Sequence, residues 1–266
     1  MICTTRELNP CFRYGSHPRH CRGWLFLVLW IGSLFQIQAQ EESPYQIHRS
    51  LDISLGASAL TLATTSYLLS LQVDPLTSSQ LASLSPTDIP GFDRSATNTW
   101  RPGIAKASDV LLIGGMLSPG LFIFSRRIRS DIGVQLLMGA ETYFSTFALT
   151  QTTKLAVLRN RPLTYISTND PELLAIQMKP SSRFSFFSGH TSMAATMCWY
   201  TASVYDQYFP RSSARPLVWA AAASVPAVVG WMRVRSGKHF ATDVIVGYLV
   251  GAGIGWLIPR LHRKRK

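Results

Sequence analysis

The chain has 266 residues, of which 47% are hydrophobic and only 15% are charged, and its formal net charge is +12. The charged fraction is well below the quarter or so that is typical of soluble domains, which argues against a globular protein that faces water on all sides. The basic residues fall in short clusters between apolar runs rather than in one stripe, so the positive charge does not indicate a nucleic-acid-binding protein.

The N-terminal segment has the pattern of an export signal. Arginines precede the apolar run WLFLVLWIGSLF at residues 24–35, and Ala39 is a candidate cleavage point. Because the basic region is long, an uncleaved anchor is the alternative, and we expect residues 1–40 to be one or the other. Three of the four cysteines precede this run, which leaves no disulfide framework and no cysteine metal site.

Six later segments are apolar and close to the ~20 residues that a helix needs to cross a bilayer. They are 51–71, 104–125, 132–153, 190–207, 216–234 and 240–258, the last ending at Pro259. The polar stretches 72–103 and 163–187 are predicted to be loops. The pattern predicts an all-α bundle of about six helices embedded in a membrane, with residues 41–103 as an N-terminal helix and polar loop and 104–266 as the main domain.

Polar residues inside these segments would have to face other helices in lipid. Lys106, Asp109 and Glu141 are the examples. Cys198 lies in a helical run and is expected to be a small core residue.

The basic clusters at 126–129, 211–215 and 260–266 predict which side of the membrane is cytoplasmic, by the positive-inside rule. The loops at 72–103, 154–189 and 235–239 then share the opposite side. This arrangement starts segment 51–71 in the cytoplasm, whereas cleavage near Ala39 would leave residue 41 outside. Three explanations stay open. The N-terminal segment is not an export signal, segment 51–71 lies along the membrane interface without crossing it, or the whole bundle is exported.

The stretch FSFFSGHTSMAAT, residues 184–196, enters an apolar helix through a serine, a glycine and a histidine. Ser188 is a good N-cap, and the backbone N–H groups after it have no partner within the helix. Gly189 lets a ligand approach the backbone, and a helix N-terminus suits an anion such as phosphate. His190 would stand beside that anion as a proton donor.

Two further stretches supply positive charge and a second histidine. KLAVLRNRP contributes Lys154 and Arg161, and RVRSGKHFATD begins with Arg233. Fixed cations are the usual means of stabilising the charge that develops in phosphoryl transfer. His239 and Asp243 are four residues apart and would share one face of a helix, where the carboxylate fixes the imidazole tautomer.

The order and spacing of these three stretches resemble the type 2 phosphatidic acid phosphatase (PAP2) superfamily, which also includes bacterial acid phosphatases and vanadate haloperoxidases. The family pattern reads K-x6-RP, then PSGH, then SR-x5-H-x3-D. The chain departs from it at two positions, with Phe187 in place of the proline and Met232 in place of the serine.

The resemblance implies a PAP2/haloperoxidase-like fold and a metal-independent phosphatase that acts on phosphate monoesters or diphosphates, chiefly of lipids. His239 would form a phosphohistidine, Asp243 would orient it, and His190 would protonate the leaving group and later activate water. The phosphoryl oxygens would be held by Lys154, Arg161, Arg233 and the N–H groups of Ser188, Gly189 and His190. No cofactor or metal is expected there, since no acidic cluster of the kind that magnesium prefers accompanies the motifs.

Several polar residues near the motifs are not expected to take part in catalysis. Arg159 and Arg235 are expected to meet lipid headgroups or solvent, Lys238 to point away from His239, and His262 to lie on the surface. Asp170 and Glu172 are expected in a solvated loop, and Thr191 and Ser192 to serve the helix backbone.

The expected location is a bacterial cell envelope, in the inner membrane with the site facing the periplasm. The expected partners are a lipid phosphate substrate and the membrane, without nucleic acid, and the sequence fixes neither the individual lipid nor an oligomeric state. Three other functions stay open: an exported acid phosphatase for small soluble esters, a vanadate-dependent peroxidase, and a non-catalytic lipid-binding or transport protein.

Overall fold

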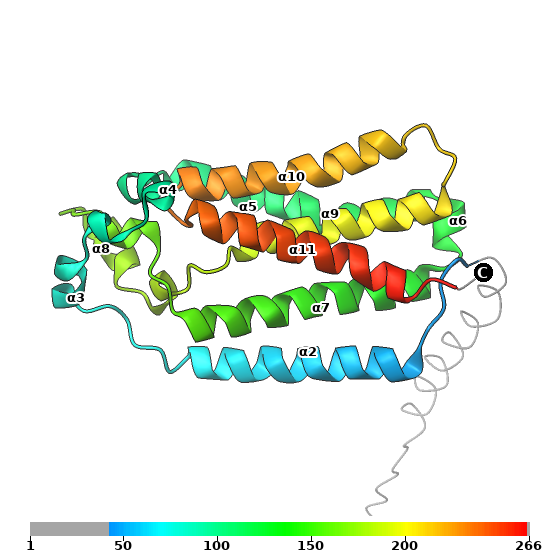
Figure 1. Cartoon of the computed structure of the whole chain (residues 1–266), viewed down its shortest axis with the longest axis horizontal. Helices are drawn as coiled ribbons and strands as arrows, with labels where there is room; N and C mark the ends of the chain where they lie inside the picture. The colour runs from blue at the N-terminus through cyan, green and yellow to red at the C-terminus, as the bar shows by residue number, and fades with distance from the viewer. Residues whose placement is uncertain (1–42, 265–266) are drawn as a thin grey trace, which may run out of the picture. The chain divides into compact units, whose positions relative to one another are not determined.

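The computed structural model describes residues 43–264, and these form an all-α bundle (Figure 1). Its six long helices are α2 (Arg49–Ser70), α5 (Pro102–Met116), α7 (Ile132–Val157), α9 (Gly189–Tyr208), α10 (Arg215–Arg235) and α11 (Ala241–Leu261). The prediction of an all-α bundle of about six helices is confirmed. Helix α11 continues through Pro259 to Leu261, and the expected signal peptide or anchor at residues 1–40 lies outside the described residues.

The two predicted loops hold short helices rather than irregular chain. The stretch 72–103 contains α3 (Ser78–Ser83), η1 (Pro86–Asp88), α4 (Gly91–Arg94) and η2 (Ser95–Asn98). The stretch 163–187 contains most of η4 (Pro162–Tyr165), then α8 (Pro171–Gln177) and η5 (Pro180–Arg183). The remaining short elements, η3 (Ser118–Phe124) and α6 (Arg126–Arg129), join α5 to α7.

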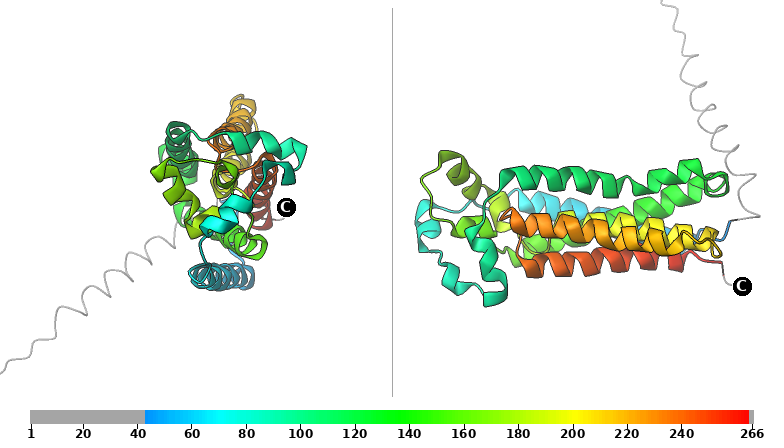
Figure 2. Two further views of the ribbon diagram at one scale, coloured as in Figure 1. Left: turned by 90° about the vertical axis from the view of Figure 1, so that its left-hand side faces the viewer. Right: turned by 90° about the horizontal axis from the view of Figure 1, so that it is seen from above.

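Helix α9 is the centre of the bundle, since it packs against α5, α7, α10 and α11 (Figure 2). Two of its polar side chains pair with threonines of α7. Thr146 of α7 lies 2.9 Å from Thr196, and Thr150 of α7 lies 3.2 Å from Ser192, in both cases between hydroxyl oxygens. Hydroxyl pairs of this kind let a helix of moderate polarity be buried among apolar neighbours.

The crossing of α9 and α11 depends on three glycines at four-residue spacing. A methyl group on Gly247, Gly251 or Gly255 would lie 2.7, 2.1 or 2.3 Å from a backbone carbonyl oxygen of residues 188, 192 or 196. Only glycine permits so close an approach of two helix backbones. The crossing brings the start of α11 against the start of α9, where the backbone N–H of Ser188 donates to the carbonyl of Asp243 at 3.0 Å.

Within residues 43–264, four helical segments are long and apolar enough to be candidate membrane spans. They are Arg49–Ser70, Pro102–Phe124, Arg215–Arg235 and Ala241–Leu261. Large apolar side chains remain exposed on each, for example Leu60, Val110, Leu217 and Leu249, as a lipid-facing surface requires. Helices α7 and α9 are not among the candidates because they carry the polar residues that face one another inside the bundle.

The basic clusters at 126–129 and 211–215 and the described part of the third cluster, residues 260–264, lie at one end of the bundle, and the short helices α3, α4 and α8 lie at the other (Figure 1). We call these the basic end and the loop end. Helix α2 starts at the basic end, where Tyr45 forms an isolated bridge with Arg263 and the N–H of Gln46 donates to the carbonyl of His262 at 2.8 Å. Helix α2 then packs lengthwise against α7 rather than lying apart from the bundle.

The expectation that His262 lies on the surface is wrong. Its side chain is fully buried at the basic end, against Asp52 of α2 and Glu141 of α7. The basic residues around it in sequence suggested solvent, but the segment at Gln46, together with α2 and α7, packs against the end of α11. The expectation that Glu141 faces other helices is confirmed.

Candidate active site

The start of α9 has the predicted capping arrangement. The Ser188 hydroxyl accepts a hydrogen bond from the N–H of Thr191 at 3.4 Å, and Gly189 is the first residue of the helix. The Lys154 ammonium lies 3.1 Å from where a side chain on Gly189 would begin, so the lysine sits over the helix N-terminus. A cation and unpaired N–H groups at one point make a place for an anion.

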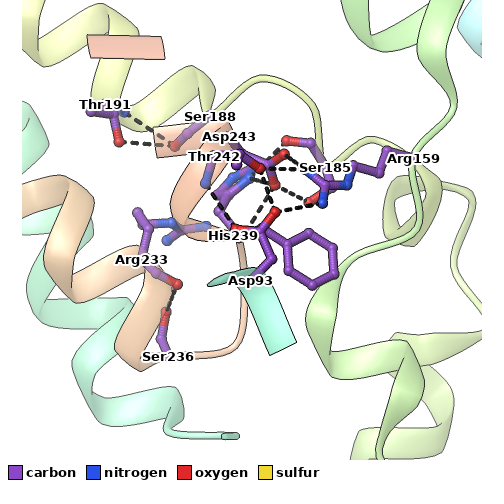
Figure 3. Close-up of polar contacts among 11 residues, drawn as sticks. Asp93, Arg159, Ser185, Ser188, Thr191, Arg233, Ser236, His239, Thr242 and Asp243 are labelled. Atoms are coloured by element: carbon purple, nitrogen blue, oxygen red, sulfur yellow. Dashed lines mark hydrogen bonds and ion pairs between the residues drawn. The ribbon is translucent and has the colours of Figure 1, made fainter. Parts of the chain in front are cut away.

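His239 lies beside this point, buried to 1% exposure, in the bend between α10 and α11 (Figure 3). Its Nδ1 lies 2.8 Å from the carbonyl oxygen of Ser185 and 3.6 Å from Oδ2 of Asp243. A carbonyl can only accept, so Nδ1 carries the proton and Nε2 keeps its lone pair. The backbone of Ser185 therefore fixes the tautomer at hydrogen-bond distance, with the carboxylate of Asp243 slightly farther away.

The spacing argument for His239 and Asp243 assumed that one helix carries both residues, which is wrong, because α11 begins at Ala241. Asp243 is at the third position of α11 and its Oδ2 accepts from the N–H of Phe240 at 2.9 Å and from the Ser185 hydroxyl at 2.5 Å. The aspartate thus caps its own helix and holds the Ser185 segment against it.

Arg159 belongs to this network, contrary to the expectation that it meets lipid headgroups or solvent. It donates to Asp243 at 2.6 Å and to Asp93 of α4 at 2.8 Å (Figure 3). Its guanidinium also stacks on the Phe240 ring. Asp93 also accepts from the N–H of Thr242 at 3.0 Å. No local pattern singles out Asp93, so sequence reasoning could not find the partner that holds Arg159 inside.

Three cations approach the same place from different elements. Lys154 is in the last turn of α7, Arg161 follows the left-handed residue Leu158 that ends α7, and Arg233 is in the last turn of α10. The Nε atoms of Arg161 and Arg233 are buried without a hydrogen-bond partner among residues 43–264. Buried donors of this kind are costly unless an acceptor comes to them, which favours an anion-binding role.

Burial and the neighbouring charges set the protonation states around His239. Burial is the main cause that holds the pKa of His239 well below its usual value, Asp243 opposes it, and Arg161 and Arg233 lower it further. Burial lowers the pKa of Arg161 to about 10, with Asp243 opposing, so the guanidinium stays charged at neutral pH. The imidazole is therefore neutral and the guanidinium positive, as a nucleophile beside a phosphate requires.

Asp109 of α5 is a member of the site that sequence reasoning did not assign to it. Its Oδ1 lies 2.8 Å from Nε2 of His190 and 3.1 Å from Nη1 of Arg233, which also donates to the Ser108 hydroxyl at 3.1 Å. One carboxylate oxygen thus bridges two of the predicted phosphate contacts. The sequence did hold a signal for this role, because Asp109 is an acidic residue within an apolar segment.

A cavity of about 370 Å³ opens beside these residues at the loop end. His190 and Arg233 line it, together with Trp100, Pro102, Ala105, Lys106, Asp109, Glu172, Ile176 and Lys238. Lys238, which was expected to point away from His239, lines this cavity and lies 4.7 Å from the centre of the Trp100 ring. Glu172 is exposed, as expected, but it lies in the first turn of α8 rather than in a loop, and it lines the cavity.

Comparison with known proteins finds similarity in the part of the chain that contains the three motifs. The sequence profile of the PAP2 superfamily matches residues 135–266. Phosphatidylglycerophosphatase B of Bacillus subtilis (strain 168) is 34% identical over 86 residues, which are 32% of this chain and 42% of the relative, so the match spans about two fifths of that protein.

Among solved structures, the crystal structure of the first transmembrane PAP2 type phosphatidylglycerolphosphate phosphatase from Bacillus subtilis is similar at 21% identity with a TM-score of 0.46. The similarity covers 79% of this chain and 94% of that chain.

Proposed function

The chain belongs to the PAP2 superfamily through residues 135–266, and on this premise we propose that it is a membrane phosphatase that hydrolyses lipid phosphate monoesters or diphosphates. One observation carries the proposal. The neutral, tautomer-fixed imidazole of His239 lies near Arg161 and Arg233, whose Nε atoms are buried without a partner in the described chain. The ammonium of Lys154 lies near the same two arginines.

In the proposed reaction the lone pair on Nε2 of His239 attacks phosphorus and the bond to the leaving oxygen breaks. His190 gives that oxygen a proton. In the second step His190 takes a proton from water, the hydroxide attacks phosphorus, and the bond between phosphorus and His239 breaks. The cations and the N–H groups of Gly189 and His190 hold the equatorial oxygens throughout. The N–H of Ser188, which was also expected to bind phosphate, instead donates to the carbonyl of Asp243.

Asp109 would accompany this chemistry as a positioning residue. In the free protein its carboxylate holds His190 and Arg233 at the mouth of the cavity. A phosphate that enters would take over the contact with Arg233, and the carboxylate would remain the partner of His190. On this view the phosphatase domain begins upstream of the matched segment, with α5, in agreement with a boundary near residue 104.

Lipid phosphates are the favoured substrates because the cavity opens at the end of an apolar bundle and combines apolar residues with Lys106 and Lys238. The Bacillus subtilis relative is a phosphatidylglycerophosphatase, which also favours a lipid phosphate as substrate. The full chain in detergent micelles should release phosphate from phosphatidylglycerophosphate and polyprenyl diphosphate at least tenfold more efficiently than from an aryl phosphate. Release from the aryl phosphate alone would indicate an acid phosphatase, and release from none a non-catalytic protein.

We further propose that the loop end faces the periplasm of a bacterial cell, because the basic clusters lie at the other end. In a chain with its native cysteines replaced, single cysteines at Ser167 and Ser213 probe the two ends, since both positions are exposed. A membrane-impermeant reagent applied to intact spheroplasts should label position 167 and spare position 213. The reverse labelling would invert the proposed orientation, and equal labelling of a protein freed by osmotic shock would rule out a membrane span.

A further inference from the structure

Three ionisable side chains from distant parts of the chain meet inside the basic end of the bundle. Asp52 comes from the first turn of α2, Glu141 from α7, and His262 directly follows α11. Their side chains are 8%, 4% and 0% exposed. Nε2 of His262 lies 2.8 Å from Oδ1 of Asp52 and 3.2 Å from Oε2 of Glu141.

The hydrogen bonds of His262 show that a positive centre is needed among these atoms. Nδ1 lies 2.9 Å from the carbonyl oxygen of Ile258, so Nδ1 carries a proton. Nε2 of the neutral imidazole is then an acceptor that faces two carboxylate oxygens, which are acceptors as well. Three lone pairs at these distances repel one another, so either a proton or a metal ion must lie between them.

A proton on the imidazole leaves the cluster incomplete. Both oxygens of Glu141 and Oδ2 of Asp52 are buried without a hydrogen-bond partner within residues 43–264. Two ionised carboxylates and one imidazolium also carry a net charge of −1, which is expensive in a buried site. Burial raises the pKa of Glu141, so a proton that this carboxyl shares with Asp52 is the competitor of a cation at this place. A divalent cation with a neutral imidazole brings the charge to zero and gives the unpartnered oxygens a ligand role.

The geometry suits a small divalent metal. All donor atoms lie within 4.8 Å of one another. Zinc bonds of about 2.0–2.2 Å place tetrahedral ligand atoms roughly 3.3 Å apart, a few tenths of an ångström more than the spacings around Nε2. A ligating histidine that donates its other N–H to a backbone carbonyl is the usual outer-shell arrangement, and calcium and magnesium prefer oxygen ligands alone.

We propose that Asp52, Glu141 and His262 bind one divalent cation, with zinc the best match. The site is separate from the phosphate chemistry, since it lies at the opposite end of the bundle. Helix α2 packs mainly against α7, and one side-chain hydrogen bond, Ser66 to Thr152 at 2.8 Å, links the two. The cation therefore fastens α2 to α7 and to the end of α11.

The test uses the full chain purified in detergent, without a polyhistidine tag, from cells grown with added zinc. Elemental analysis should find about one zinc per chain. Chelation should lower the Tm by about 5–10 °C and zinc should restore it. Glu141→Gln and Asp52→Asn should each reduce bound zinc at least tenfold. The matched control is Asp206→Asn, which removes a carboxylate at the same end that pairs with Arg215 at 2.5 Å and should keep the metal.

His239→Ala should bind zinc as the wild type does, so the result does not depend on the proposed phosphatase activity. A wild-type chain without metal, whose Tm zinc and manganese leave unchanged, would overturn the proposal. Zinc retained in both carboxylate variants would place the metal elsewhere and overturn it too. If the variants do not fold, X-ray absorption of the wild type decides between one nitrogen with oxygens, as expected, and any other ligand set.

Discussion

The two ends of the bundle each bury a histidine in the same local geometry, and the two sites have opposite neighbours. His239 and His262 both direct Nδ1 to a backbone carbonyl, at 2.8 and 2.9 Å, and both are almost fully buried. His239 has Asp243 on its Nδ1 side and the cations Arg161 and Arg233 nearby, whereas His262 has two carboxylates on its Nε2 side. Burial and tautomer therefore do not distinguish the two histidines. We infer that the neighbouring cations or carboxylates decide whether Nε2 meets an anion or a cation.

Loss of His239 should have the largest effect. His239→Ala removes the proposed nucleophile and should lower kcat by about 10⁴-fold or more with an unchanged Tm. Labelled substrate quenched in acid should leave no alkali-stable phosphohistidine. His262→Gln is the counterpart at the other end and should lower the Tm while keeping kcat. Normal turnover in His239→Ala would show that His239 is not the nucleophile.

His190→Ala should lower kcat by about 10²–10⁴-fold for lipid substrates, because it removes the proton donor. A substrate with a very acidic leaving group needs little proton donation and should still phosphorylate His239. Hydrolysis of the intermediate should then stall, so that rapid-quench kinetics show a burst followed by slow turnover. If leaving-group acidity made no difference, His190 would have to be given another role.

The α9–α11 crossing, which positions the loop-end site, can be loosened directly. Gly251→Ala places a methyl group 2.1 Å from the Ser192 carbonyl and should destabilise the bundle by about 1–3 kcal/mol. Gly253→Ala is the matched control, because nothing lies within 4 Å of its new methyl group, and it should be neutral or stabilising by up to about 1 kcal/mol. Thermal unfolding in detergent measures both. Equal Tm values would show that the close approach is not required.

The smallest expected effect concerns pH and Lys238. Burial, together with the charges of Arg161 and Arg233, lowers the pKa of this lysine to about 8. The ammonium is positive below that value and loses its charge as the pH rises through it, so KM for an anionic substrate should increase a few-fold above pH 8. Lys238→Met should raise KM at pH 7 and abolish the rise of KM above pH 8. If KM still rises above pH 8 in the variant, the titrating group is not Lys238.

Most of the architecture could be predicted from the sequence because helix formation and membrane insertion depend on local composition. The apolar runs placed five of the six long helices to within four residues at each end, whereas α5 ends at Met116 and the rest of its predicted segment holds η3. The three motifs brought Lys154, Arg161, His190 and Arg233 into consideration before any contact was known. The capping role of Ser188 followed from its position in front of Gly189, since an N-cap is a property of a few consecutive residues.

Tertiary structure decided the fate of the other charged residues, because whether a charge is buried depends on partners far away in the chain. Arg159 turned inward to Asp93 and Asp243, which lie 66 and 84 residues away. His262 met Asp52 across 210 residues, although its neighbours in sequence are basic and suggested solvent. Such pairings require the helices to be packed first, since only then does the loss of water make an unpaired charge costly and a partner necessary.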